Sequence, residues 1–272
     1  MQGMKTFLLM AVMTFILAVL GNLIGGRNGL ILALGIAGVS NLLTYWFSDK
    51  MVLKAYKARP LDPDHEIHRM TSDLAGKAGL PVPKVYLINQ SQPNAFATGR
   101  NPKHAVVAVT KGLVDGMSRH ELSGVIGHEL GHIHNRDMLI GTVAATMAGA
   151  ISYLGYAVRF GSGRGRGGQG NSGLLIIVAM ILAPLAAMLI RMAISRTREY
   201  KADEFGAKVS GNPDYLASAL GKLESWSKKI PMRGNPASSH LFIVHPFSGK
   251  SMASLFSTHP NTQDRIRRLK KM

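Results

Sequence analysis

The sequence SRHELSGVIGHELGHIHNRD at residues 118–137 predicts one helix. Ser118 and Glu121 are three positions apart, which is the spacing of a capping box, so we expect the helix to begin at Ser118. No proline follows before the next apolar segment, and we expect the helix to continue into it. On such a helix His128 and His132 are four positions apart and share one face, so both can bind one metal ion.

Glu129 completes the pattern His-Glu-x-x-His. Its carboxylate would lie next to a metal-bound water and could accept a proton from it, which is the chemistry of zinc-dependent hydrolases. The pattern alone is only moderately specific, because it also arises by chance. Here the surrounding positions are uncharged, which suits a buried metal-binding helix. These positions are Val125, Ile126, Gly127, Leu130, Gly131 and Ile133.

A second motif supplies a further metal ligand. Residues 195–207 read SRTREYKADEFGA, in which Glu199 and Asp203 are four positions apart and share a helical face. A catalytic zinc has three protein ligands and one open position. We therefore expect one Zn²⁺ per chain with Glu199 as third ligand, and Asp203 as the carboxylate that orients a ligand histidine, His128 in first place. Without the histidine motif, the same spacing would indicate a surface helix with paired charges.

Charge and hydrophobicity are unusually combined in this chain. Its 272 residues include 32 Lys and Arg against 15 Asp and Glu, a net charge of +17, yet 46% are hydrophobic. The apolar content excludes a disordered basic tail. The absence of cysteine excludes a disulfide-stapled secreted domain and leaves histidine and carboxylate as metal ligands. The combination is typical of a membrane protein with apolar segments beside basic ones.

Four segments without a charged residue are candidate membrane spans. A bilayer core about 30 Å thick needs about 20 helical residues, with a lower limit of about 17. The first three segments have that length, and the strictly apolar part of the fourth is near the limit. Each could instead be a buried helix of a soluble protein, and the first a signal peptide. The segments are 6–26, 28–48, 138–158 and 167–190, with 174–190 the apolar part of the last.

Basic residues near the ends of these segments set the expected orientation, because the side richer in Lys and Arg faces the cytoplasm. One side carries Lys5, Lys50, Lys54, Lys57, Arg59, Arg136, Arg191, Arg196, Arg198 and Lys201. The other carries only Arg27, Arg159, Arg164 and Arg166. Both termini are therefore expected inside. If the 118–137 helix runs on into the third span, the metal would lie about 10 Å beyond the bilayer edge.

The motifs HELGH and RxxEYxADEFGA together resemble the HtpX group of membrane heat-shock zinc metalloproteases, which is related to the CAAX prenyl proteases. The resemblance covers nearly the whole chain, including PNAFATG at residues 93–99 and a late Thr-His-Pro. It implies a mainly helical α+β, gluzincin-like catalytic domain at the cytoplasmic face of the bacterial inner membrane. The expected parts are an N-terminal hairpin, a first catalytic part, a second hairpin and a second catalytic part, at residues 1–50, 51–137, 138–190 and 191–272.

Three β-rich runs precede the metal-binding helix, at residues 84–89, 94–98 and 105–110. We expect them to form a small antiparallel sheet. An exposed edge strand can pair with an extended peptide through backbone hydrogen bonds. The resemblance assigns this substrate-binding role to Asn94, Ala95 and Phe96, although an ordinary β-hairpin would explain the same residues.

Two further residues follow from the late element STHPNTQDR, residues 257–265. Hydrolysis places negative charge on the former carbonyl oxygen, and a well-placed donor lowers that barrier. The resemblance gives this catalytic role to His259 and a substrate-binding role to Arg265. Asn261 stands where the family pattern usually has a second proline. Arg265 also fits a plain basic C-terminal helix.

The function predicted from these observations is a membrane-bound zinc endopeptidase. The resemblance implies that it cleaves misfolded or damaged membrane proteins during stress, with polypeptides and the bilayer as partners and no nucleic acid. One alternative is a protease with its metal site inside a span, which the many charges of residues 118–137 disfavour. The other is a non-enzymatic basic protein that binds anionic lipid or nucleic acid.

Overall fold

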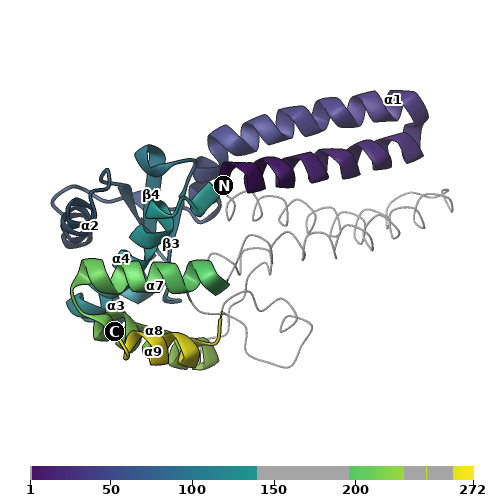
Figure 1. Cartoon of the computed structure of the whole chain (residues 1–272). Coiled ribbons are helices and arrows are strands. Elements are labelled where there is room, and N and C mark those ends of the chain that lie inside the picture. Colours follow the sequence, from purple (N-terminus) through teal and green to yellow (C-terminus); the bar gives the residue numbers. More distant parts are fainter. Residues whose placement is uncertain (1, 140–195, 230–242, 244–259) are drawn as a thin grey trace.

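The structure, a computed structural model, describes residues 2–139, 196–229, 243 and 260–272. Four strands and several helices of very different length make up this part of the chain (Figure 1). In chain order they are α1 (Gln2–Ala55), β1 (Arg59–Pro60), α2 (Glu66–Lys77), β2 (Lys84–Ile88), β3 (Ala95–Gly99), η1 (Pro102–His104), β4 (Ala105–Thr110), α3 (Lys111–Gly116), α4 (Arg119–His134), α7 (Arg196–Ser210), α8 (Pro213–Lys229) and α9 (Thr262–Leu269).

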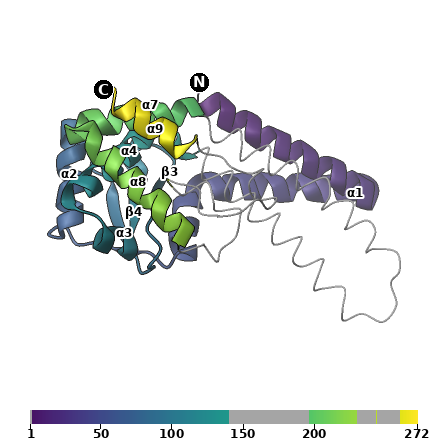
Figure 2. The same ribbon diagram turned by 90° about the horizontal axis from the view of Figure 1, so that it is seen from below.

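Helix α1 is a hairpin whose two arms lie side by side and extend away from the rest of the fold (Figures 1 and 2). The chain reverses near Gly26, which has a φ of 56°, a value that glycine adopts without strain. Next to the turn, a side chain on Gly21 would collide with the backbone of Gly29. Farther along, the Asn41 side-chain amide donates to the Thr14 hydroxyl at 2.8 Å and joins the two arms.

Part of the predicted membrane region can be tested against this hairpin. Among the residues that the structure describes, Gly26–Phe47 is long and apolar enough to cross a bilayer, and only 6% of its most apolar stretch is buried. The apolar stretch Met10–Val19 is shorter. The third and fourth predicted spans lie almost wholly outside the described residues. One clear span candidate therefore stands, and four spans remain a prediction.

The sheet has the strand order β1-β2-β4-β3. The three predicted strands are present within one residue of their expected bounds, and the short β1 pairs with β2 at one edge. The prediction of an antiparallel sheet was wrong, because β2 and β4 are parallel while the outer pairs are antiparallel. Parallel neighbours need a crossover of roughly a dozen residues or more, and residues 89–104 supply it.

This crossover leaves β3 at the second edge of the sheet, paired only with β4 among the described strands. Every residue of β4 is buried, as expected for a central strand with covered faces. The edge strand β3 lies against α4, so the crossover places an edge of the sheet beside the helix that carries the predicted metal ligands His128 and His132.

Helices α4, α7, α8 and α9 pack together on one side of the sheet (Figure 1). Ile126, Leu130 and Ile133 of α4 are fully buried, together with Leu216 and Leu220 of α8. They form one continuous apolar core with β2, β4 and α2. Burying a side chain of this size contributes about 1.5–3 kcal/mol, so the core holds α4 rigidly in place.

Helix α4 begins as predicted and ends earlier than predicted. The Ser118 backbone N–H donates to Glu121 Oε2 at 2.8 Å, and the Ser118 hydroxyl accepts from the Glu121 N–H, so the capping box is present. The helix stops at His134, because Asn135 caps it and Arg136 has a left-handed φ of 57°. The prediction of an uninterrupted helix was therefore wrong. The distance of about 10 Å between the metal and the bilayer edge assumed that helix and no longer follows.

Glu121 also fastens α4 to α8, and this predicts a stability effect. It accepts from the Ser218 hydroxyl at 2.6 Å and from Lys222 at 2.7 Å. Burial raises its pKa, but these donors and Ser118 outweigh burial and lower the pKa from 4.5 to about 2. The stabilisation is therefore complete above pH 4.5 and is lost as the pH falls towards 2.

Glu121→Gln should reduce the free energy of unfolding by about 1–3 kcal/mol at pH 7, because Lys222 loses its charged partner. It should also weaken the acid destabilisation below pH 4.5. Chemical denaturation at several pH values measures both effects. Glu66→Gln is a suitable control, since its contact with Arg119 at 3.6 Å is exposed and worth about 0–1 kcal/mol. Equal losses in the two variants would contradict the assignment.

Candidate metal centre

Helices α4 and α7 approach each other closely because small residues face each other at their contact. A side chain on Gly206 would lie 2.7 Å from the His128 backbone nitrogen, and one on Gly127 would lie 2.9 Å from the Gly206 carbonyl oxygen. One turn later, a side chain on Gly131 would lie 2.9 Å from the Ala202 Cα. This close contact brings Glu199 of α7 to the histidines of α4.

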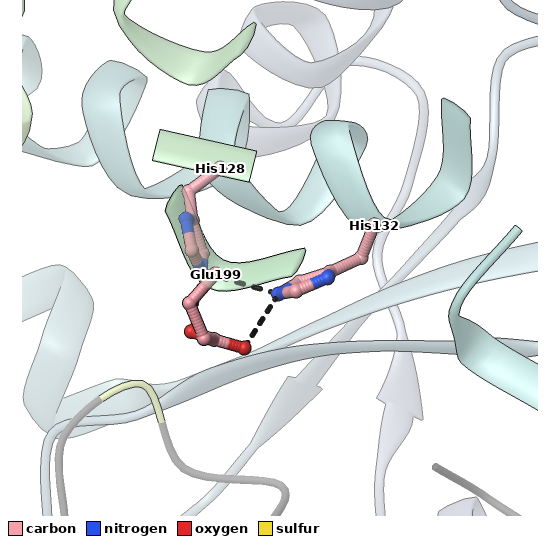
Figure 3. Close-up of side chains that lie close together, drawn as sticks. All are labelled: His128, His132 and Glu199. Carbon is pink, nitrogen blue, oxygen red and sulfur yellow. Dashed lines mark hydrogen bonds and ion pairs between the residues drawn. The ribbon is translucent and has the colours of Figure 1, made fainter. Parts of the chain in front are cut away.

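The three predicted metal ligands meet at one point (Figure 3). His128, His132 and Glu199 each offer a ligand atom, and these atoms all lie within 4.8 Å of one another. The two histidine Nε2 atoms are 3.2 Å apart. Glu199 Oε2 lies 3.7 Å from Nε2 of His128, and Oε1 lies 3.6 Å from Nε2 of His132.

These separations fit a zinc ion. Bonds of about 2.0–2.1 Å in a tetrahedral arrangement separate ligand atoms by about 3.3 Å. Side-chain exposure differs among the ligands: 1% for His128, 6% for Glu199 and 20% for His132. The set is thus closed on one side and accessible at His132, as a catalytic site with an open position requires.

Glu129 lies in the same buried environment, with 3% of its surface exposed. Burial raises the pKa of its carboxyl group, and nearby Glu199 raises it further. The charges of His128 and His132 and a hydrogen bond with the Ala97 backbone of β3 act in the opposite direction, but the net shift is upward. A raised pKa makes Glu129 a better proton acceptor near neutral pH.

Asp203 and Arg265 lie behind His128. The Nδ1 atom of His128 is 2.9 Å from Asp203 Oδ1. Arg265 donates twice to the same carboxylate, from Nε at 2.8 Å and from Nη2 at 2.6 Å. Burial raises the pKa of Asp203, but Arg265 and His128 outweigh it and keep the pKa well below its usual range. The Asp203 carboxylate is therefore ionised and can fix the tautomer of His128.

The structure places Arg265 inside the protein, with 1% of its surface exposed. Besides Asp203 it donates to the Ile243 carbonyl at 2.9 Å, and its Nη1 lies 3.6 Å from Glu199 Oε2. Its contact with substrate remains a prediction, because among the described residues Arg265 is bonded to Asp203, Glu199 and the Ile243 backbone.

Asp137 and Arg198 were not predicted as site residues. Asp137 Oδ2 lies 3.5 Å from His132 Nδ1, and Arg198 Nη1 lies 3.8 Å from Asp137 Oδ1. Burial lowers the pKa of His132, but Asp137, Glu199 and Glu129 outweigh it and raise the pKa to about 9. The carboxylates around His132 thus favour a positive charge beside its ring. A bound Zn²⁺ would supply that charge.

The predicted substrate-binding segment forms the start of the edge strand. Ala95 and Phe96 pair with Val109 and Ala108 of β4, and both are buried. Asn94 is also buried, and its side-chain oxygen accepts from the Ile243 N–H at 3.4 Å. The other predicted catalytic residue, His259, lies outside the described residues.

A buried His-Glu-x-x-His helix, a carboxylate from a later helix and an adjacent strand edge define a metallopeptidase site. Comparison with known families agrees, because Peptidase family M48 matches residues 62–272. This chain belongs to that family.

Individual relatives support the same assignment, and a solved structure has a similar fold. The chain is 51% identical over 273 residues to a "Protease HtpX homolog" of Desulforapulum autotrophicum, covering 98% of this chain and 88% of the relative. It is 49% identical over 277 residues to "Protease HtpX" of Legionella pneumophila, covering 100% and 99%. The crystal structure of S. mikatae Ste24p has a TM-score of 0.53 at 19% identity, covering 99% of this chain and 63% of Ste24p. That last similarity, to less than two thirds of Ste24p, shows the fold alone.

These comparisons decide between the functions considered from the sequence. The chain is a membrane metallopeptidase, so the predicted enzyme class is confirmed and the non-enzymatic alternative is wrong. The intramembrane alternative receives no support, since Gly26–Phe47 is the clear span candidate among the described residues and α4 is not part of it.

Proposed function

We propose that this metallopeptidase is a zinc-dependent endopeptidase with His128, His132 and Glu199 as zinc ligands. The observation that carries the proposal is the convergence of their ligand atoms within 4.8 Å on two helices held together by glycine contacts. A zinc ion held there would activate water and polarise the scissile carbonyl group.

Glu129 acts as the general base in this proposal. It accepts a proton from the attacking water and passes it to the leaving amine. The edge of β3 positions the peptide: an extended substrate that pairs with this strand would lie next to Glu129, which is hydrogen-bonded to the Ala97 backbone. Ala95 and Phe96 would then be part of the strand that pairs with the peptide. Asn94 would serve by fixing the start of this strand, because its backbone N–H and carbonyl are hydrogen-bonded to Thr110. His259 is proposed to stabilise the oxyanion.

The proposed substrates are polypeptides, in particular misfolded or damaged membrane proteins during stress. Support comes from the relatives named HtpX and from the hairpin α1, in which Gly26–Phe47 is long and apolar enough to cross a bilayer. The excess of Lys and Arg on one side favours a bacterial inner-membrane protein with its catalytic part and both termini in the cytoplasm.

Removal of zinc tests this function directly. Full-length protein purified in mild detergent should contain about one zinc per chain and should cleave an unfolded polypeptide. Treatment with a chelator should abolish cleavage, and stoichiometric Zn²⁺ should restore it while Mg²⁺ does not. Elemental analysis and an internally quenched peptide assay provide the two readouts. Full activity in zinc-free protein would refute the proposal.

A further inference from the structure

Each of the two histidine ligands has its own aspartate and arginine behind it. His128 contacts Asp203, which Arg265 binds from α9. His132 contacts Asp137, which lies next to Arg198 of α7. The sequence predicted only the first aspartate as an orienting group. The second set has the same chemical order of histidine, carboxylate and guanidinium, at the longer separations of 3.5 Å and 3.8 Å.

We propose that Asp137 is a positioning residue for the metal centre. It fixes the orientation of the His132 ring, and Arg198 in turn fixes the position of Asp137. The contact is made to Nδ1 at 3.5 Å, which leaves Nε2 directed towards Glu199 and His128. A carboxylate at one ring nitrogen fixes the tautomer so that the other nitrogen can bind a metal. The inference rests on the proposed zinc ligands.

Burial indicates that this arrangement is not a casual surface contact. Asp137 and Arg198 are each 7% exposed, and buried charges are rarely retained without a partner. Arg198 directly precedes the ligand Glu199, so one short segment of α7 supplies both a metal ligand and the cation that faces Asp137. Movement of this segment would therefore change two of the three ligands at once.

The backbone supports the same role. Asp137 would point elsewhere if α4 continued, because five positions on a helix do not bring side chains to one face. Instead the helix ends at His134, and the left-handed turn at Arg136 returns Asp137 to His132. The Asp137 N–H donates to the His132 carbonyl at 3.0 Å, which fixes the return.

Asp137 and Arg198 also lie on opposite sides, in sequence, of residues 138–190, the predicted second hairpin. Their contact thus joins the two described stretches of chain that flank this segment, the residues after α4 and the start of α7. It follows that His132 is the ligand whose orientation depends on the ends of that segment, whereas His128 depends on α9 through Arg265.

The test is the zinc affinity of purified full-length protein, measured by competition with a chromophoric chelator. Asp137→Asn should bind zinc roughly 10–100-fold more weakly and change the absorption spectrum of the Co²⁺-substituted protein. Arg198→Met should weaken binding in the same direction, and Arg198→Lys should restore most of it. The double variant Asp137→Asn/Arg198→Met should lose little more than Asp137→Asn alone, because both act through one contact.

Glu121→Gln is the matched control, because it removes another buried, ion-paired carboxylate of the same region without contact to the metal ligands. It should leave zinc affinity and the Co²⁺ spectrum unchanged. Zinc binding by Asp137→Asn within about twofold of wild type, or an equal loss in Glu121→Gln, would overturn the inference. If Asp137→Asn does not fold, the comparison of Arg198→Met with Arg198→Lys decides. Wild-type protein that binds no zinc would instead refute the proposed function.

Discussion

Glu129→Gln should retain about one zinc per chain and cleave an unfolded polypeptide about 10²–10⁴-fold more slowly than wild type. The amide has nearly the shape of the carboxylate, so the contacts of α4 with the sheet should persist. It cannot accept a proton from water, and the proposed reaction needs that transfer in its first step. The Glu129 side chain is not one of the three converging metal ligands, so zinc affinity should change little.

Rate and zinc content must be measured on the same preparation, free of host proteases. The control is Glu121→Gln, the same substitution on the same helix but in contact with α8 and away from the ligands. Assayed below its unfolding temperature, it should cleave at close to the wild-type rate. Undiminished cleavage by Glu129→Gln would remove the general-base assignment, whereas loss of zinc would show that Glu129 supports the ligand set.

The parts of the site that were predictable from the sequence depend on local spacing. Ser118 and Glu121 define a helix start within four residues, and His128 and His132 share a helical face whatever surrounds them. The Glu199 motif was assigned by the same local rule. Because a catalytic zinc needs a third protein ligand, we could expect Glu199 to lie close to the two histidines. The structure brings the three side chains together.

Features that depend on how distant segments meet were not predictable in this way. The parallel pairing of β2 with β4 follows from a crossover, which β-rich runs alone do not reveal. The end of α4 depends on Asn135 and Arg136, which carry no proline or glycine signal. Because that end was missed, Asp137 was read only as one of the charges of its helix and not as a partner of His132.

The second large effect is expected from substitution of the glycines at the contact of α4 with α7, which should lower both zinc affinity and stability. Gly206→Ala would place a methyl group 2.7 Å from the His128 backbone nitrogen and 3.0 Å from its Cα. Neither atom can move aside, since both belong to the backbone of a buried helix, so α7 must shift outward. Overpacking of this kind costs about 1–3 kcal/mol. The shift would also carry Glu199 away from the histidines.

We therefore expect Gly206→Ala to lose zinc affinity by at least about tenfold and to lower the melting temperature, although alanine favours helices more than glycine. Gly221→Ala on α8 is the matched control, because its methyl group would meet only Ile266 Cδ1 at 4.0 Å. That variant should keep its zinc affinity and gain up to about 1 kcal/mol from helix propensity. Chelator competition and thermal unfolding distinguish the two. Should Gly206→Ala bind zinc like wild type, the close helix contact would not be what sets the ligand geometry, and the position of Glu199 would have to depend on Arg198 and Arg265 instead.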